Sequence, residues 1–158
     1  MVKKRIRVLI VEDNEATAYL IKTAFLRKSS TVDWDLCFAK DGEEALDCIF
    51  KHGAYEEAAL PDLILLDWNL PKVHGQEVLQ KLKSTDELRT LPVLVFSTSQ
   101  SDEDVHAAYS SHANGYIAKP SDMDAFYAVI ESIETFWAHT VRLPPKRDGR
   151  LPTKASSN

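Results

Sequence analysis

Apolar stretches rich in β-branched residues alternate with amphipathic stretches along most of this chain. The apolar stretches lie at residues 5–11, 32–39, 63–66, 93–96 and 116–118. Each is followed by a stretch with helical periodicity, at residues 15–27, 43–52, 76–83, 102–111 and 122–138. Strands that alternate with helices form βαβ units, in which the strands are parallel and helices cover both faces of the sheet. The sequence therefore predicts a doubly wound α/β domain with a five-stranded parallel sheet.

Two local patterns support this interpretation. The runs VLIV (8–11) and LILL (63–66) are apolar at every position, as in strands that are buried on both faces. Ser101 with Asp104, and Ser121 with Asp124, have the spacing of a capping box. We therefore expect the last two helices to begin just after these serines. The alternation does not determine the order of the strands in the sheet.

The composition is that of a globular protein outside the membrane. The chain has 158 residues, of which 44% are hydrophobic and 27% are charged. Its apolar runs are much shorter than the roughly 20 residues of a membrane span. The N-terminal apolar stretch runs into Glu12 and Asp13 and lacks a cleavage site for a signal peptidase. These features predict a cytoplasmic protein.

Charge and cysteine content exclude further classes. Cys37 and Cys48 lack metal-ligand spacing and are expected to be free thiols. Residues 1–141 carry 14 basic and 23 acidic side chains, which disfavours DNA binding, whereas residues 142–158 carry five basic and one acidic. We expect residues 1–141 to form a single domain and residues 142–158 to form a flexible, basic, proline-containing tail.

Polar side chains follow four of the five predicted strands. Glu12 and Asp13 follow the first strand, Asp67 the third, Ser97 the fourth and Lys119 the fifth. In an open α/β sheet, ligands bind beyond the carboxyl ends of the strands, so we expect these groups to lie together. Three acids at one edge repel one another unless a cation is present. Hard oxygen ligands favour Mg²⁺, with Mn²⁺ as an alternative.

Each of these residues also has an ordinary interpretation. Asp13 alone would pass for a helix cap, Ser97 for a loop residue and Lys119 for a solvated charge. Together they suit phosphoryl transfer to a carboxylate. Asp67 would attack the phosphorus, and Mg²⁺, Lys119 and Ser97 would stabilise its oxygens.

Four segments resemble the receiver domain of bacterial two-component response regulators: VLIVEDNEA, DLILLDWNLPKVHGQEVL, LPVLVFSTS and GYIAKP. The resemblance extends over residues 5–137 and has every segment at its expected strand end. It implies the flavodoxin-like strand order 2-1-3-4-5 and a phosphoacceptor role for Asp67, supplied by the phosphohistidine of a sensor kinase. It also implies that Asp13, Asp67 and the backbone carbonyl of Asn69 bind Mg²⁺, with Glu12 acting through a metal-bound water.

The resemblance further assigns a conformational switch. Lys119 would pair with the phosphoryl group, Ser97 would move towards it, and Tyr116 would turn inward behind Ser97. Thr98 stands where many receivers have alanine, so it would narrow access to the phosphoryl group and slow dephosphorylation. Output would pass through a changed protein-interaction face to an unknown downstream protein.

A narrower resemblance concerns KHGAYEEAALPD, LPK, STS and FWAHTVRLPP. These segments are similar to the small response regulators that partner bacterial and cyanobacterial phytochromes. This likeness implies a light-sensing histidine kinase as the phosphodonor and a homodimer that uses the extended last helix.

Other classes fit the sequence less well. A phosphatase of the haloacid dehalogenase type needs an aspartate at the position of Asn69, a flavin phosphate would be repelled by Glu12 and Asp13, and no GxxxxGK[ST] motif is present. The remaining alternative is a receiver-like interaction module that acts without phosphorylation. Binding of Mg²⁺ distinguishes it from an intact receiver.

Overall fold

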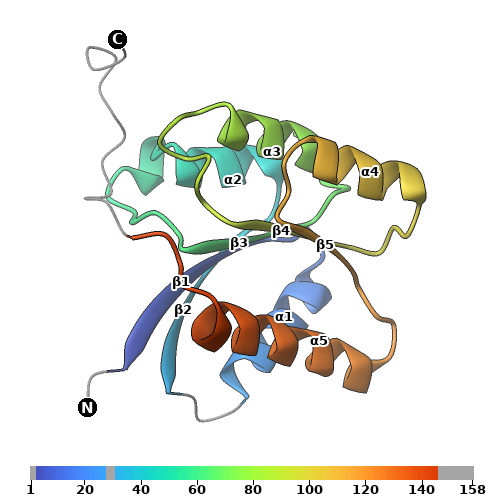
Figure 1. The fold of residues 1–158 in the computed structure, drawn as a ribbon. Helices are drawn as coiled ribbons and strands as arrows, with labels where there is room; N and C mark the ends of the chain where they lie inside the picture. Colours follow the sequence, from blue (N-terminus) through green and yellow to red (C-terminus); the bar gives the residue numbers. More distant parts are fainter. Residues whose placement is uncertain (1–2, 28–30, 146–158) are drawn as a thin grey trace.

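The fold is a five-stranded parallel sheet between two layers of helices (Figure 1). The computed structural model describes residues 3–27 and 31–145. In chain order the elements are β1 (Lys4–Val11), α1 (Glu15–Leu26), β2 (Val32–Ala39), α2 (Gly42–Ile49), η1 (Gly53–Tyr55), β3 (Leu63–Leu66), α3 (Gly75–Lys83), β4 (Val93–Ser97), α4 (Asp102–Ser110), β5 (Gly115–Ala118), α5 (Met123–Thr135) and η2 (Phe136–Thr140). The strand order is β2-β1-β3-β4-β5 and every pair is parallel. The predicted fold class and strand order are confirmed.

Successive residues of the central strands face opposite layers. Figure 1 shows α2, α3 and α4 on one face of the sheet, and α1 and α5 on the other. Leu9 and Leu66 belong to the core under α2, α3 and α4, whereas Val8 and Leu65 belong to the core under α1 and α5. All four side chains are at most 1% exposed. Burial of each contributes roughly 1.5–3 kcal/mol, which explains why these strands are apolar at every position.

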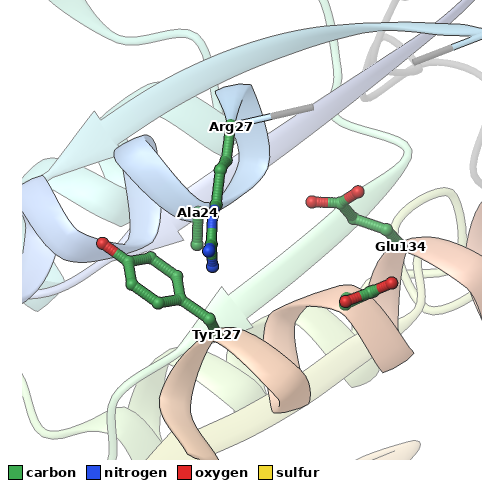
Figure 2. Close-up of a pocket in the computed structure, with 5 residues that line it drawn as sticks. Ala24, Arg27, Tyr127 and Glu134 are labelled. Carbon is green, nitrogen blue, oxygen red and sulfur yellow. The ribbon is translucent and has the colours of Figure 1, made fainter. Parts of the chain in front are cut away.

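The helix α1 is held against α5 by a surface contact as well as by its apolar side. The guanidinium of Arg27 lies 4.6 Å from the centre of the Tyr127 ring (Figure 2). The pocket beside this contact, lined by Ala24 and Glu134 among others, has a volume of about 20 Å³. Such a space is sufficient for about one water molecule. The contact between Arg27 and Tyr127 therefore contributes to the packing of α1 against α5.

One of the two predicted helix starts is confirmed and the other is corrected. Ser101 caps α4 as predicted, because its Oγ accepts a hydrogen bond from the N–H of Asp104 at 3.1 Å. The cap of α5 is Asp122, whose carboxylate accepts from the N–H of Ala125 at 2.9 Å, and the prediction of Ser121 was wrong. Both residues have a suitable side chain, but α5 begins at Met123, which puts Asp122 at the cap position.

The last helix also ends differently from the prediction. Regular α-helical structure stops at Thr135, and a single π-helical turn continues to Thr140. One face of the helix is apolar, because Phe126, Ile130 and Ile133 are buried and Trp137 packs, partly buried, against the same core. A π-turn retains helical periodicity closely enough to pass for α-helix in a sequence pattern.

The remaining expectations concern thiols, membranes and the tail. Cys37 and Cys48 are both free thiols. Among the described residues, none of the helices combines the length and apolar composition of a membrane span. Leu143 packs against the core under α1 and α5. Most of the predicted tail, residues 146–158, lies outside the described residues.

Candidate functional site

Strand pairing brings the predicted site residues to one edge of the sheet. The N–H of Asp67 donates to the carbonyl of Val11 at 3.0 Å, so β3 ends beside the end of β1. The N–H of Lys119 donates to the carbonyl of Ser97 at 2.8 Å and joins the ends of β5 and β4 in the same way. Residues from four strands are therefore held at this edge by the backbone ladder.

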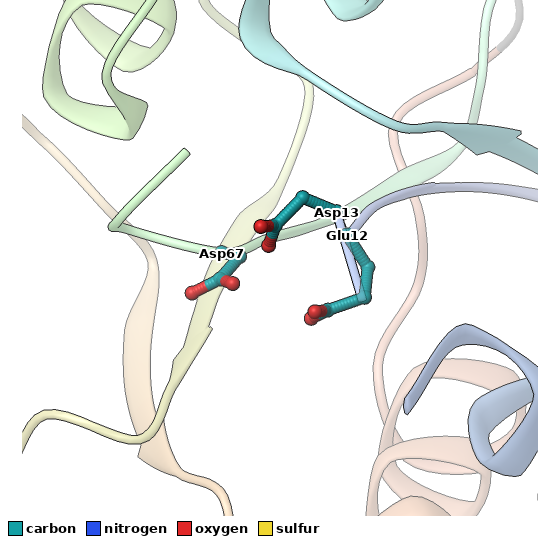
Figure 3. Close-up of side chains that lie close together, drawn as sticks. All are labelled: Glu12, Asp13 and Asp67. Carbon is teal, nitrogen blue, oxygen red and sulfur yellow. The ribbon is translucent and has the colours of Figure 1, made fainter. Parts of the chain in front are cut away.

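Three carboxylates converge at this edge (Figure 3). One oxygen from each of Glu12, Asp13 and Asp67 lies within 4.8 Å of the others. Glu12 and Asp67 are only 6% and 8% exposed, whereas Asp13 is exposed. Buried carboxylates this close together are stable only with compensating positive charge. The donor set consists of hard oxygens alone and fits Mg²⁺ or Mn²⁺.

Lys119 supplies positive charge inside the cluster. Its ammonium forms ion pairs with Glu12 and with Asp67, the latter at 3.2 Å, and its side chain is 7% exposed. Burial raises the pKa of Glu12, and the charge of Asp67 acts in the same direction, while Lys119 opposes both. The site therefore has an unfavourable accumulation of negative charge that one lysine only partly offsets.

Ser97 and Tyr116 are connected through Ser99. Ser97 is fully buried at the end of β4, and its Oγ accepts a hydrogen bond from the N–H of Ser99 at 3.3 Å. The hydroxyl of Tyr116 donates to the carbonyl of Ser99 at 2.7 Å. The sequence predicted roles for Ser97 and Tyr116 but none for Ser99. The only signal at Ser99 was its place in the STS triplet.

The loop that follows Asp67, residues 67–74, is closed by a tight backbone approach. The N–H of Gly75 donates to the carbonyl of Trp68 at 2.9 Å. A Cβ atom on Gly75 would lie 2.5 Å from the carbonyl oxygen of Asp67. Trp68 is 2% exposed and meets the ring of His74 edge-on, with 5.3 Å between ring centres. Asn69 is exposed two residues after Asp67.

A second glycine supports the same loop from α2. A Cβ atom on Gly42 would lie 2.0 Å from the carbonyl oxygen of Val73. Lys72 has a φ of 64°, and its ammonium lies 3.7 Å from a carboxylate oxygen of Asp41, the cap of α2. The loop is thus fixed on two sides by contacts with backbone atoms.

Fold and site together place a cluster of three carboxylates and a lysine at the carboxyl edge of a doubly wound parallel sheet. The family of response regulator receiver domains matches residues 8–131, and the chain belongs to this family. The prediction of the family is therefore confirmed.

The relatives include regulators of different systems. Response regulator Rcp1 of Synechocystis sp. is 39% identical over 137 residues, which cover 87% of this chain and 92% of Rcp1. A probable methanogenesis regulatory protein, FilR2 of Methanothrix harundinacea, is 41% identical over 139 residues, covering 87% of this chain and 86% of FilR2.

Solved structures show the same fold. The phosphorylated cyanobacterial phytochrome response regulator RcpA has a TM-score of 0.85 with 40% identity, and the match covers 89% of this chain and 99% of RcpA. The Mn²⁺-bound form of Rcp1 has a TM-score of 0.84 with 38% identity and the same two coverages. This chain is thus related to phytochrome response regulators, as its sequence predicted.

Proposed function

We propose that this chain is a phosphorylation-dependent response regulator in which Asp67 accepts a phosphoryl group from the phosphohistidine of a sensor histidine kinase. The observation that carries the proposal is the setting of Asp67. This buried carboxylate lies within 4.8 Å of Glu12 and Asp13 and 3.2 Å from the ammonium of Lys119. In the reaction, an Asp67 oxygen forms a bond to phosphorus while the bond from phosphorus to the kinase histidine breaks.

The acidic cluster would hold the divalent cation. Asp13, Asp67 and the backbone carbonyl of Asn69 would bind Mg²⁺ or Mn²⁺, and Glu12 would act through a water molecule. When bound, the cation supplies positive charge for an oxygen of the phosphoryl group. The carboxylate chemistry of the cluster and the Mn²⁺-bound structure of the relative Rcp1 support this assignment.

Lys119 and Ser97 would interact with the negatively charged oxygens of the phosphoryl group. The ammonium that now pairs with Asp67 would pair with a phosphoryl oxygen, and the Ser97 hydroxyl would move towards another. Tyr116 would report this movement to the face formed by α4, β5 and α5, where an unidentified downstream protein would bind. This arrangement makes the protein a switch rather than an enzyme with turnover on a separate substrate.

The relatives support a class of kinase partner, and one exposed side chain supports a homodimer. The similarity to RcpA, a cyanobacterial phytochrome response regulator, supports a phytochrome-type kinase as the donor here. We also propose a cytoplasmic location for this protein. Phe136, directly after α5, is 46% exposed. We propose that it takes part in a homodimer, which sedimentation of the protein and of Phe136→Ser tests directly.

The test of acceptor chemistry uses Mg²⁺, a small acyl phosphate and a panel of histidine kinases that includes phytochromes. Mass spectrometry should show a gain of one phosphoryl group that disappears in Asp67→Asn and after chelation of the metal. Asp62→Asn is a matched control, because Asp62 is equally buried at 8% exposure but precedes β3 instead of following it.

Two results would contradict the proposal. Labelling that persists in Asp67→Asn would move the acceptor elsewhere. A failure of every donor to label the protein would favour the alternative, an interaction module that works without phosphorylation.

A further inference from the structure

The short loop between β4 and α4, residues 98–101, contains one residue that bonds to three separate parts of the switch. Ser99 donates its N–H to the Oγ of Ser97 at 3.3 Å and accepts from the hydroxyl of Tyr116 at 2.7 Å. Its own hydroxyl donates to a carboxylate oxygen of Asp104, in the first turn of α4, at 2.5 Å. Backbone N–H, backbone carbonyl and side chain of Ser99 are therefore all engaged.

We propose that Ser99 is a positioning residue that couples the movement of Ser97 to Tyr116 and to the start of α4. The inference rests on the proposed function and assigns its internal transmission to a side-chain bond between Ser99 and Asp104. Ser99 has no direct part in the chemistry at Asp67.

The bond to Asp104 is what makes the coupling effective. A hydroxyl that donates to a carboxylate forms a charge-assisted hydrogen bond, which is roughly twice as strong as a neutral one. It ties the peptide units on both sides of Ser99 to the first turn of α4, so the loop and the helix end move together. Without it, the Ser99 side chain would keep its longer contacts, at 3.4 Å, with the N–H and hydroxyl of Ser101, the cap residue of α4.

The position of Tyr116 provides the second connection. Tyr116 lies in β5 opposite Val95 of β4, and it packs against the core that contains Ala108 of α4. When Ser97 turns towards a phosphoryl group, the N–H of Ser99 loses its acceptor. The resulting shift of Ser99 then reaches α4 by two routes, through Asp104 and through Tyr116.

The experiment compares hydrogen exchange in α4 with and without beryllofluoride and Mg²⁺, a mimic of the phosphoryl group on Asp67. Beryllofluoride binding is measured in parallel by the fluorescence of Trp68, the neighbour of Asp67. In the parent protein, the ligand should change the exchange rates of the first turn of α4. In Ser99→Ala and in Asp104→Ala this change should be at least about threefold smaller, since a hydrogen bond to a charged group contributes about that factor or more to an equilibrium. Both variants should still bind beryllofluoride and accept a phosphoryl group.

Two controls separate coupling from simple loosening of α4. Ser101→Ala removes the cap bond to the N–H of Asp104, together with the 3.4 Å contact between the hydroxyls of Ser99 and Ser101, and loosens the helix. It leaves the bond between Ser99 and Asp104. It should retain the response to beryllofluoride, and Ser99→Thr, which keeps the hydroxyl, should retain it as well.

The outcomes are distinguishable. An undiminished response in Ser99→Ala or Asp104→Ala overturns the role of Ser99, as does an equal loss in Ser101→Ala. Absence of any response and of any phosphoryl adduct in the parent protein instead contradicts the proposed function itself.

Discussion

The two loops that border Asp67 and Ser97 are held in place by different forces. The acceptor loop, residues 67–74, is held by backbone contacts that leave no room for a methyl group at Gly75 or Gly42. The switch loop, residues 98–101, is held by hydrogen bonds of serine hydroxyls, above all that of Ser99. Steric contacts of this kind resist displacement, whereas a single hydrogen bond contributes about 1 kcal/mol net, or about 1.5–3 kcal/mol when one partner is charged, and can be exchanged for another. The proposed function requires Asp67 to stay in position as the nucleophile and the loop after Ser97 to move.

Of the substitutions that test this difference between the loops, Gly75→Ala is expected to have the largest effect on stability. The added methyl would meet the carbonyl of Asp67 at 2.5 Å, so we expect the free energy of unfolding to fall by about 3 kcal/mol in urea titrations. Gly53→Ala is the matched control, because Gly53 has a φ of 57° but a methyl group there would have no atom within 4 Å. Gly53→Ala should lower the free energy of unfolding by about 1 kcal/mol, because only the unfavourable backbone conformation contributes. Equal losses in the two variants would show that the acceptor loop is not sterically fixed.

Tyr55→Phe tests the attachment of η1 to α2, the helix whose first residue, Gly42, contacts the acceptor loop. The Tyr55 hydroxyl donates to Glu44 at 2.8 Å, and this bond raises the pKa of Tyr55 from the ordinary value of 10 to about 12. Because the folded-state pKa is the higher one, the stabilisation is complete below pH 10 and is lost as the pH rises through about 12. We expect the variant to be less stable by about 1 kcal/mol at pH 8.

The difference between Tyr55→Phe and the parent should become smaller in urea titrations above pH 10. Tyr19→Phe, at a side chain that is 68% exposed, should show neither effect. A difference that stays constant between pH 8 and 11 would mean that the hydrogen bond to Glu44 does not form in solution.

Thr98→Ala gives the smallest expected effect and tests the switch loop. Thr98 is exposed directly after the buried Ser97. If its side chain limits the access of water, phosphoryl loss from Asp67 should be about threefold faster in the variant, because excluded water slows hydrolysis. The rate is measured by mass spectrometry after removal of the donor, with Thr98→Ser as an intermediate case. An unchanged rate would remove Thr98 from the control of phosphoryl lifetime.

The sequence by itself determined the elements and the residues at the sheet edge. Continuous apolar runs such as 63–66 indicated strands buried on both faces, and helical periodicity located the five helices. Glu12, Asp67 and Lys119 were found because every parallel strand delivers its carboxyl end to the same edge. These inferences need only local periodicity and one rule of sheet geometry. The strand order came from the family resemblance, not from the pattern. The metal-binding role of Asn69 remains a prediction.

Only the tertiary structure decided how these residues bond to one another. It placed the cap of α5 at Asp122 instead of Ser121, paired Lys119 with both Glu12 and Asp67, and connected Ser99 to Asp104 and Tyr116. The residues of most of these contacts come from different elements, and their side-chain distances depend on how the helices pack on the sheet. Periodicity in a sequence states which face a side chain lies on, but a hydrogen bond requires two atoms within about 3 Å, and packing alone sets that distance.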